Sequence, residues 1–163
     1  MNQTPQTDFD FSKQLIKGKI TELVFEQMFR KMGNFTVIPF GYESVQPEIM
    51  QHSHLAKYKE VFDNIRTAPD FALVSHDKKE VFLVEVKYRS NHTAEEMKEM
   101  AEKIQERWKL VRVFLATPTG FYFDSCHSVL KNEGQVSPLK AEWITEDIQA
   151  EYLTLLNQFI KKS

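Results

Sequence analysis

The stretch from residue 69 to residue 87, PDFALVSHDKKEVFLVEVK, restricts the possible folds more than any other part of the chain. Two runs of strand-forming residues flank a polar turn, a pattern typical of a β-hairpin. If the turn is centred on Asp77 and Lys78, opposed residues have numbers that sum to 155, and Asp70 lies opposite Glu85. Directly opposed side chains in an antiparallel pair lie about 5 Å apart at Cβ, where like charges repel. Two facing carboxylates therefore predict a cation between them.

Lys87 follows Glu85 by two positions, so both side chains lie on the same face of the strand. The run from Phe82 to Val86 is otherwise apolar on both faces, so we expect Glu85 to be partly covered. Burying an isolated carboxylate is costly unless the group is paired or binds a metal. Taken singly, each side chain is explained by a turn or an exposed strand edge. Two acids and a lysine in one place predict a metal-dependent hydrolytic site.

The length and composition are those of an ordinary soluble protein. We expect the 163 residues to form one domain with a packed core, with residues 1–11 as a flexible tail. No apolar run approaches the roughly 18–20 residues of a membrane span, so we expect no membrane partner. The single cysteine, Cys126, fits a cytoplasmic location. The net charge of −2 argues against a globally basic nucleic-acid binder, although the carboxylates of the site contribute to it.

The apolar spacing predicts helices alternating with strands. The first helix is expected from Ser12, as N-cap, to Met32, with Gly33 ending it. Residues 41–68 are expected to be an insertion between core strands, with a short amphipathic helix at 55–66, and residues 124–140 to be mostly loop. The other expected elements are strands at 35–40, 70–75, 80–88 and 110–117, a short strand after Gly120, and helices at 93–108 and 145–161.

The strand at 110–117 is apolar at nearly every position, which is typical of a strand covered by helices on both faces. Together with the order of the elements, this predicts an α/β fold. The expected architecture is a three-layer α/β/α sandwich with a central mixed sheet.

The motif Pro69–Asp70, the motif Glu85–Lys87 and an acid-bearing helix before them resemble the PD-(D/E)xK nuclease superfamily. The order of elements over about residues 12–123 is similar to the common core of that family. The resemblance implies a restriction-endonuclease-like fold and a nuclease that hydrolyses phosphodiester bonds, with DNA as the expected substrate. It also implies a possible homodimer, because many members of the family are dimers.

The resemblance further implies that Asp70, Glu85 and the backbone carbonyl of Val86 bind Mg²⁺, for which Mn²⁺ would substitute. Mg²⁺ prefers oxygen ligands and usually keeps several waters. Lys87 would orient the attacking water or stabilise negative charge that develops during the reaction. Whether one or two metals are used stays open.

Several other residues join the candidate site through the same resemblance or through their position. The segment Gly18–Glu22 resembles the Gly-xxx-Glu entry of resolvase-like members, so we choose Glu22 as a further acid. Glu26 lies four residues later on the same helix face and is the alternative. Tyr88 and Arg89 follow the site directly and are candidate substrate contacts. Gln105 is a further candidate, because some relatives place a glutamine near the site.

The sequence also allows interpretations other than a nuclease. A domain that keeps this fold and binds nucleic acid or protein without catalysis is the alternative function. His52 and His54 lie in an expected loop and are better explained as solvated histidines, and the segment Asp124–His127 as a surface or packing element. The residues do not distinguish DNA from RNA or endonuclease from exonuclease. They also leave open whether residues 41–68 shape substrate access or a dimer interface.

Overall fold

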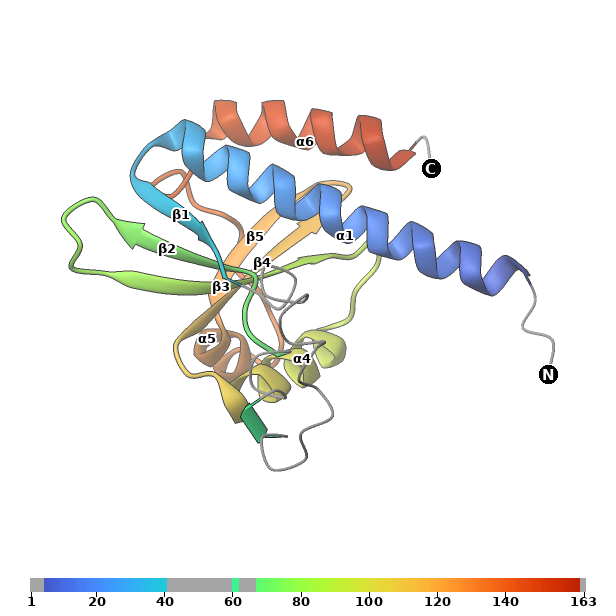
Figure 1. Ribbon diagram of the computed structural model, residues 1–163, viewed down its shortest axis with the longest axis horizontal. Helices are drawn as coiled ribbons and strands as arrows, with labels where there is room; N and C mark the ends of the chain where they lie inside the picture. Colours follow the sequence, from blue (N-terminus) through green and yellow to red (C-terminus); the bar gives the residue numbers. More distant parts are fainter. Residues whose placement is uncertain (1–4, 41–59, 62–66, 162–163) are drawn as a thin grey trace.

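A computed structural model describes residues 5–40, 60–61 and 67–161. Its centre is a five-stranded sheet in which the strands follow the order of the sequence (Figure 1). β3 and β4 are parallel, and every other neighbouring pair is antiparallel, so the predicted mixed sheet is confirmed. The strands are β1 (Phe35–Pro39), β2 (Phe71–Ser75), β3 (Val81–Tyr88), β4 (Val111–Thr117) and β5 (Gly120–Ser125).

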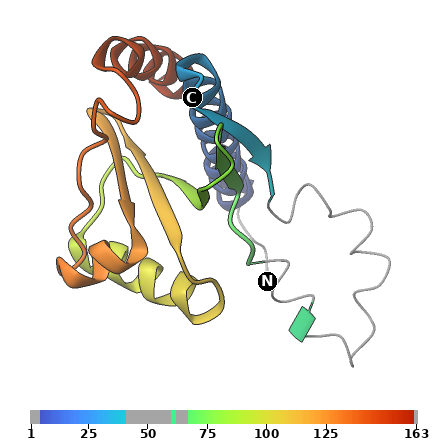
Figure 2. The same ribbon diagram turned by 90° about the vertical axis from the view of Figure 1, so that its left-hand side faces the viewer.

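Helices cover both faces of this sheet, as Figure 2 shows from the side. α1 (Pro5–Met32) and α6 (Glu146–Lys161) lie on one face, and α4 (Ala94–Arg107) and α5 (Cys126–Lys131) lie on the other. α4 also joins the parallel strands β3 and β4, which cannot be connected by a tight turn. The predicted α/β class with helices on both faces of the sheet is therefore confirmed. None of the helices in the described ranges is long and apolar enough to cross a membrane.

The alternation of side chains along β3 divides its residues between the two layers. Val84 and Val86 are buried in the apolar core beneath α1 and α6. Leu83 packs into the smaller core beneath α4 and α5. Because side chains alternate along a strand, Glu85 and Lys87 lie on the same face as Leu83. The sheet therefore presents the candidate site toward the layer that contains α4.

α1 differs from the sequence expectation at its beginning. The helix starts at Pro5, so residues 5–11 are helical rather than a loose tail, and Ser12 lies inside the helix rather than at its N-cap. Proline suits the first turn of a helix because it has no N–H to leave unpaired. The negative charge of Asp8 in the same turn stabilises the helix by interacting with the positive end of its dipole. The predicted end is confirmed: Gly33 has a φ of +78° and donates its N–H to the Phe29 carbonyl at 3.1 Å.

The remaining element boundaries agree closely with the sequence, with one exception. α4 agrees with the helix predicted at 93–108, and its N-cap is Thr93, whose hydroxyl oxygen accepts a hydrogen bond from the Glu96 N–H at 3.2 Å. α5 was not predicted, because residues 124–140 were expected to be mostly loop. Its N-cap is Ser125, whose Oγ accepts from the Ser128 N–H at 3.1 Å. Most of the expected insertion at 41–68, including the helix expected at 55–66, lies outside the described residues.

Candidate metal-binding and catalytic site

The turn of the β2–β3 hairpin is held by one aspartate. Asp77 Oδ1 accepts hydrogen bonds from Ser75 Oγ at 2.5 Å and from the Lys79 N–H at 3.1 Å. These bonds stabilise the carboxylate and lower the pKa of Asp77. Lys78 takes the left-handed conformation that the tight turn requires, with a φ of +58°. The turn centre is therefore where the sequence predicted it, between residues 77 and 78.

This turn sets the predicted register along both strands. Phe71 pairs with Val84, so opposed residues have numbers that sum to 155. β2 begins at Phe71, and continuing the register by one residue toward the N-terminus brings Asp70 opposite Glu85. Both side chains border one pocket of about 230 Å³. The predicted register of the hairpin is therefore confirmed, and the two acids border the same pocket.

The backbone beside Asp70 is arranged around its carboxyl group. The Val86 N–H donates to Asp70 Oδ2 at 2.8 Å, and the Phe40 N–H donates to the Asp70 carbonyl at 2.9 Å. In the continued ladder Val86 would pair with Pro69, which has no N–H to donate. The Val86 carbonyl lies on the same edge of the strand as its N–H, so Pro69 leaves it without a donor from the ladder. A carboxyl oxygen and a carbonyl oxygen thus lie on one edge of β3.

Burial and mutual repulsion make both carboxyl groups hard to ionise. Burial and the nearby charges of Glu85 and Glu22 raise the pKa of Asp70 to about 8, while the Val86 N–H and Lys87 act in the opposite direction. Burial and the charge of Glu22 also raise the pKa of Glu85, against the lowering effect of Lys87. Groups with pKa values shifted by burial and like charges are typical of functional sites.

Lys87 neutralises only part of this site. Its Nζ lies 3.0 Å from Glu85 Oε1 and forms an ion pair with it. An ion pair that balanced both acids would give a purely structural explanation of the cluster. The pKa values of Asp70 and Glu85 nevertheless stay raised with the lysine in place. The single charge of Lys87 therefore does not offset the cost of burying both acids.

The available oxygen atoms fit a hard divalent cation. Among the described residues, no three acid, histidine or cysteine side chains are placed so that they could hold a metal ion together, so Glu22 does not join Asp70 and Glu85 as a third ligand. Mg²⁺ does not need three such side chains, because it commonly uses one or two carboxylates and keeps several waters. Asp70 and Glu85 supply the carboxylates, and the Val86 carbonyl supplies a third oxygen on the same edge. These residues suit Mg²⁺ or Mn²⁺ better than a thiol- or imidazole-seeking metal.

The structure distinguishes between the two candidate acids of α1. Glu22 borders the same pocket as Asp70 and Glu85, and its charge acts on both. Each acid has an ion-pair partner on α1, Lys19 for Glu22 at 3.4 Å and Arg30 for Glu26 at 2.8 Å, but Glu26 does not border the pocket. Gly18 lies one turn before Glu22 and also borders the pocket, and a side chain added there would meet nothing within 4 Å. Glu22 is therefore the helix acid that belongs to the site.

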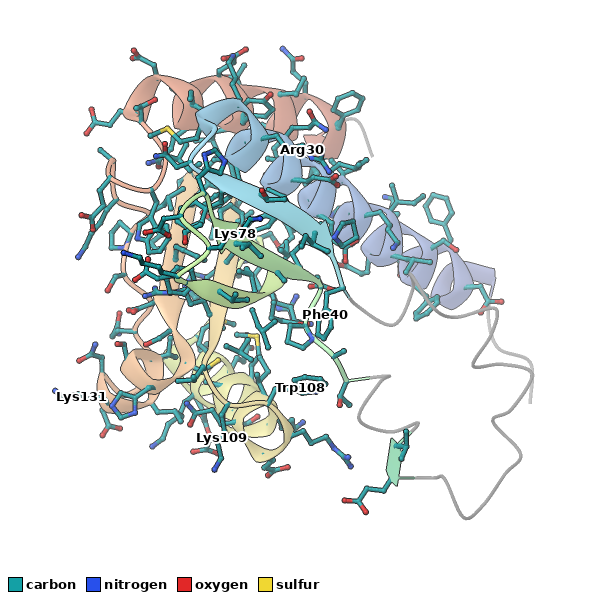
Figure 3. The ribbon with its side chains drawn as sticks, turned by 60° about the vertical axis from the view of Figure 1, so that its left-hand side comes forward. Arg30, Phe40, Lys78, Trp108, Lys109 and Lys131 are labelled. Carbon is teal, nitrogen blue, oxygen red and sulfur yellow. The ribbon has the colours of Figure 1, made fainter. Side chains whose placement is uncertain are left out.

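A larger pocket of about 720 Å³ lies next to the small one, between β3 and α4. The two pockets share Glu85, Lys87 and Arg89. Trp108 borders the larger pocket, and its ring meets the ring of Phe40 edge-on, with centroids 5.7 Å apart (Figure 3). The candidate site thus adjoins a larger groove. Sequence reasoning missed the α4 wall of this groove, although its members recur every three or four residues: Glu96, Glu99, Lys103 and Arg107.

The three predicted substrate contacts differ in their placement. Arg89 borders both pockets and donates from Nη1 to the Tyr88 carbonyl at 2.8 Å. Tyr88 is only 7% exposed and belongs to the core beneath α1, which leaves little of its ring free to stack on a base. Gln105 is half-buried on α4 and is not among the described residues that border either pocket. Arg89 is therefore the contact that the structure favours.

The remaining candidates from the sequence do not add to the site. Cys126 is fully buried, and burial raises the pKa of its thiol to about 12, so it is not a nucleophile at neutral pH. Asp124 accepts from the N–H and the hydroxyl of Ser137 at 3.3 and 2.8 Å. The packing role expected for the segment 124–127 is therefore confirmed. The histidines of residues 52–54 lie outside the described residues.

Comparison with models of known protein families and with curated protein sequences finds no match to this chain. The geometry and charge of the site are therefore the basis for assigning a function to the chain.

Proposed function

We propose that the chain is a metal-dependent nuclease with a restriction-endonuclease-like fold, which hydrolyses phosphodiester bonds in DNA with Mg²⁺ or Mn²⁺ as cofactor. The observation that carries this proposal is the buried pair of facing carboxyl groups, Asp70 and Glu85, whose pKa values stay raised beside Lys87. Such a pair has no evident structural use, because facing acids repel and destabilise the hairpin that holds them. Divalent cations that bind together with the substrate would neutralise the negative charges of both carboxylates.

The residues divide the work of hydrolysis between them. When bound, the metal supplies Lewis-acid polarisation of a phosphoryl oxygen and lowers the pKa of bound water. Asp70, Glu85 and the Val86 carbonyl would hold it, and Glu22 would add negative charge on the α1 side. Lys87 stabilises the negative charge that grows on the phosphoryl group. In the reaction, a water oxygen bonds to phosphorus, the P–O bond to the leaving nucleotide breaks, and the leaving oxygen takes a proton.

One observation favours the alternative, a domain that keeps the fold and binds nucleic acid or protein without catalysis. The Glu85–Lys87 ion pair forms without any metal, at 3.0 Å, and could be a purely structural contact. Asp70 argues against this, because it gains no ion pair of its own among the described residues and still lies in the same pocket.

Cleavage assays separate the two functions. We expect the wild-type chain to cut single-stranded, duplex or branched DNA with Mg²⁺ or Mn²⁺. Lys87→Ala should lower the rate by about 100-fold or more, as loss of one group that stabilises transition-state charge typically does. Lys79→Ala is the matched control, because Lys79 is exposed in the hairpin turn and only its N–H is used there. The nuclease proposal is wrong if the wild type is inert on every substrate and calorimetry detects no binding of divalent metal.

A further inference from the structure

The larger pocket beside the site has an apolar floor. Its floor side chains come from the inner face of α4 and from the residue that follows this helix: Met97, Met100, Ile104 and Trp108. A divalent cation or a phosphate group does not bind to apolar side chains, because both bind through charge and hydrogen bonds. A volume of about 720 Å³ is also much larger than a metal and its waters need. The groove therefore accommodates a ligand that has an apolar face.

The rim of the same pocket is polar and carries both charges. Lys87, Arg89, Lys103 and Arg107 supply positive charge, and Asn91 supplies an amide. Glu85 is one of the acids, and Glu96 and Glu99 lie on the first turns of α4. Cationic side chains bind phosphates, while amide and carboxylate groups pair with the edges of bases. An apolar floor with such a rim matches a nucleotide, which has a flat base, polar base edges and an anionic phosphate.

We propose that the groove between β3 and α4 binds an unpaired nucleotide next to the scissile phosphate, so that the substrate is single-stranded or locally unpaired DNA. In a duplex the faces of the bases are covered by their stacked neighbours, and only their edges are open to a protein. A base that lies on Met100 and Trp108 must leave the stack, which costs least when it is already unpaired. This inference rests on the proposed nuclease activity for its choice of ligand.

Binding can be measured without cleavage. Fluorescence anisotropy with Ca²⁺ in place of Mg²⁺ compares a labelled single strand with the duplex of the same sequence. We expect the single strand to bind at least tenfold more tightly, because stacking of one base on an aromatic side chain contributes about that much or more. Lys103→Glu should weaken binding of the single strand about fivefold or more, since it reverses a charge on the rim. Lys109→Glu is the matched control, because Lys109 is exposed beyond the end of α4 and does not border the pocket (Figure 3).

Tryptophan fluorescence gives a second readout of the same groove. The chain has two tryptophans, and Trp143 lies in the core beneath α1 and α6, on the opposite side of the sheet from Trp108. In a Trp143→Phe background, a single strand should therefore change the emission of Trp108. Equal binding of duplex and single strand, no change in Trp108 emission and no effect of Lys103→Glu would overturn the inference while leaving duplex cleavage possible. Tight, Lys103-dependent binding without cleavage in Mg²⁺ would instead support the groove and contradict the nuclease.

A separate observation concerns the outer surface of α1 and α6, which run antiparallel side by side (Figure 1). Phe9, Ile16 and Leu23 recur every seven residues along α1, so they lie on one stripe two turns apart. Leu155 and Phe159 of α6 border an apolar groove together with Leu23. Phe9, Leu23 and Phe159 are 60%, 59% and 58% exposed. This surface is named the α1–α6 face.

The area of the α1–α6 face matches what a homodimer needs. At the observed exposures, its five large side chains leave roughly 500 Å² of apolar surface in water. A standard interface buries about 800 Å² on each partner, of which about 65% is apolar in homodimers. We infer that a second copy of the chain covers this face around a two-fold axis, so that α1 and α6 of both copies form a four-helix layer.

Light scattering coupled to size exclusion tests this inference. At concentrations of tens of micromolar, the wild type should have twice the mass of the chain. Leu23→Glu and Phe159→Glu should each give the mass of one chain, because they place charges in the centre of the interface. Leu110→Glu is the control, since Leu110 is 88% exposed on another part of the surface. A monomeric wild type, or a dimer that survives both substitutions, would show that a second copy does not bind here.

Discussion

Asp70→Asn should abolish metal-dependent cleavage and at the same time make the metal-free protein more stable at neutral and alkaline pH. The gain in stability follows from the raised pKa of Asp70, which reaches about 8 because the carboxyl group is buried next to Glu85 and Glu22. The amide side chain has no charge to desolvate, and its oxygen still accepts the hydrogen bond from the Val86 N–H. It is, however, a far weaker ligand for a divalent cation than a carboxylate.

The stability change has a definite sign and dependence on pH. Because the folded pKa of Asp70 lies above its usual value of 3.8, the unfolded chain ionises first as the pH rises. The free energy of unfolding of the metal-free wild type therefore falls between about pH 4 and pH 8 through this group. At pH 8 with chelator, we expect Asp70→Asn to raise the free energy of unfolding by roughly 2 kcal/mol. This is less than the whole pKa shift of Asp70 would give, because the protein around a buried charge rearranges and lowers its cost.

Urea unfolding with chelator measures this effect, and Asp77→Asn is its matched control. The pKa of Asp77 is lowered by its hydrogen bonds in the turn, so neutralising that side chain should destabilise the protein at the same pH. The two Asp→Asn substitutions thus have opposite expected signs. An Asp70→Asn protein that is less stable than the wild type at pH 8, or that still cleaves DNA, would contradict the assignment of Asp70 as a strained metal ligand.

Binding of Mn²⁺ should strengthen steeply with pH, by about tenfold for each pH unit from pH 6 toward pH 8, and then level off. Below its raised pKa, Asp70 holds a proton that a cation must displace before the carboxylate can coordinate it. One proton released per metal gives the tenfold dependence. Glu85 also has a raised pKa and would add to the effect at the acidic end.

Calorimetry in two buffers with different heats of ionisation counts the released protons directly. At pH 7 we expect about one proton per Mn²⁺ for the wild type. Cys126 does not contribute, because its thiol pKa is raised to about 12 and stays protonated through this range. An affinity that is constant from pH 6 to pH 8 would mean that the acids are already ionised without metal, and the cation would then have no special role in this cluster.

The hairpin and its facing acids could be predicted because they depend on neighbours in sequence. The turn residues, the two-residue alternation of the strands and the apolar run around Glu85 are all visible within residues 69–87. The first turns of α1 could not be predicted in this way. Serine is favoured at helix N-caps, so Ser12 indicated a later start, and the structure shows that the helix begins at Pro5. α5 is a short helix of six residues, and its apolar positions also fit a loop that packs on the sheet.

The larger pocket could not be predicted for a different reason. It exists because α4 returns across the sheet and places Lys103 and Trp108 near Arg89, which is a contact between distant parts of the chain. In the sequence, the charged positions of α4 are those of any solvated helix surface. Tyr88 is the opposite case. It follows the site residues directly in the sequence, but its side chain is mostly buried beneath α1.

The turn at Asp77 and Lys78 has a consequence for the engineering of the chain. Asp70, Glu85, Lys87 and the loop that aligns them form one uninterrupted segment, so the three side chains could be moved together into another hairpin of the same loop length. Inserting a single residue in the loop would shift the pairing by one and rotate Glu85 and Lys87 to the opposite face of the sheet. The position of the site residues therefore depends on the length of this loop.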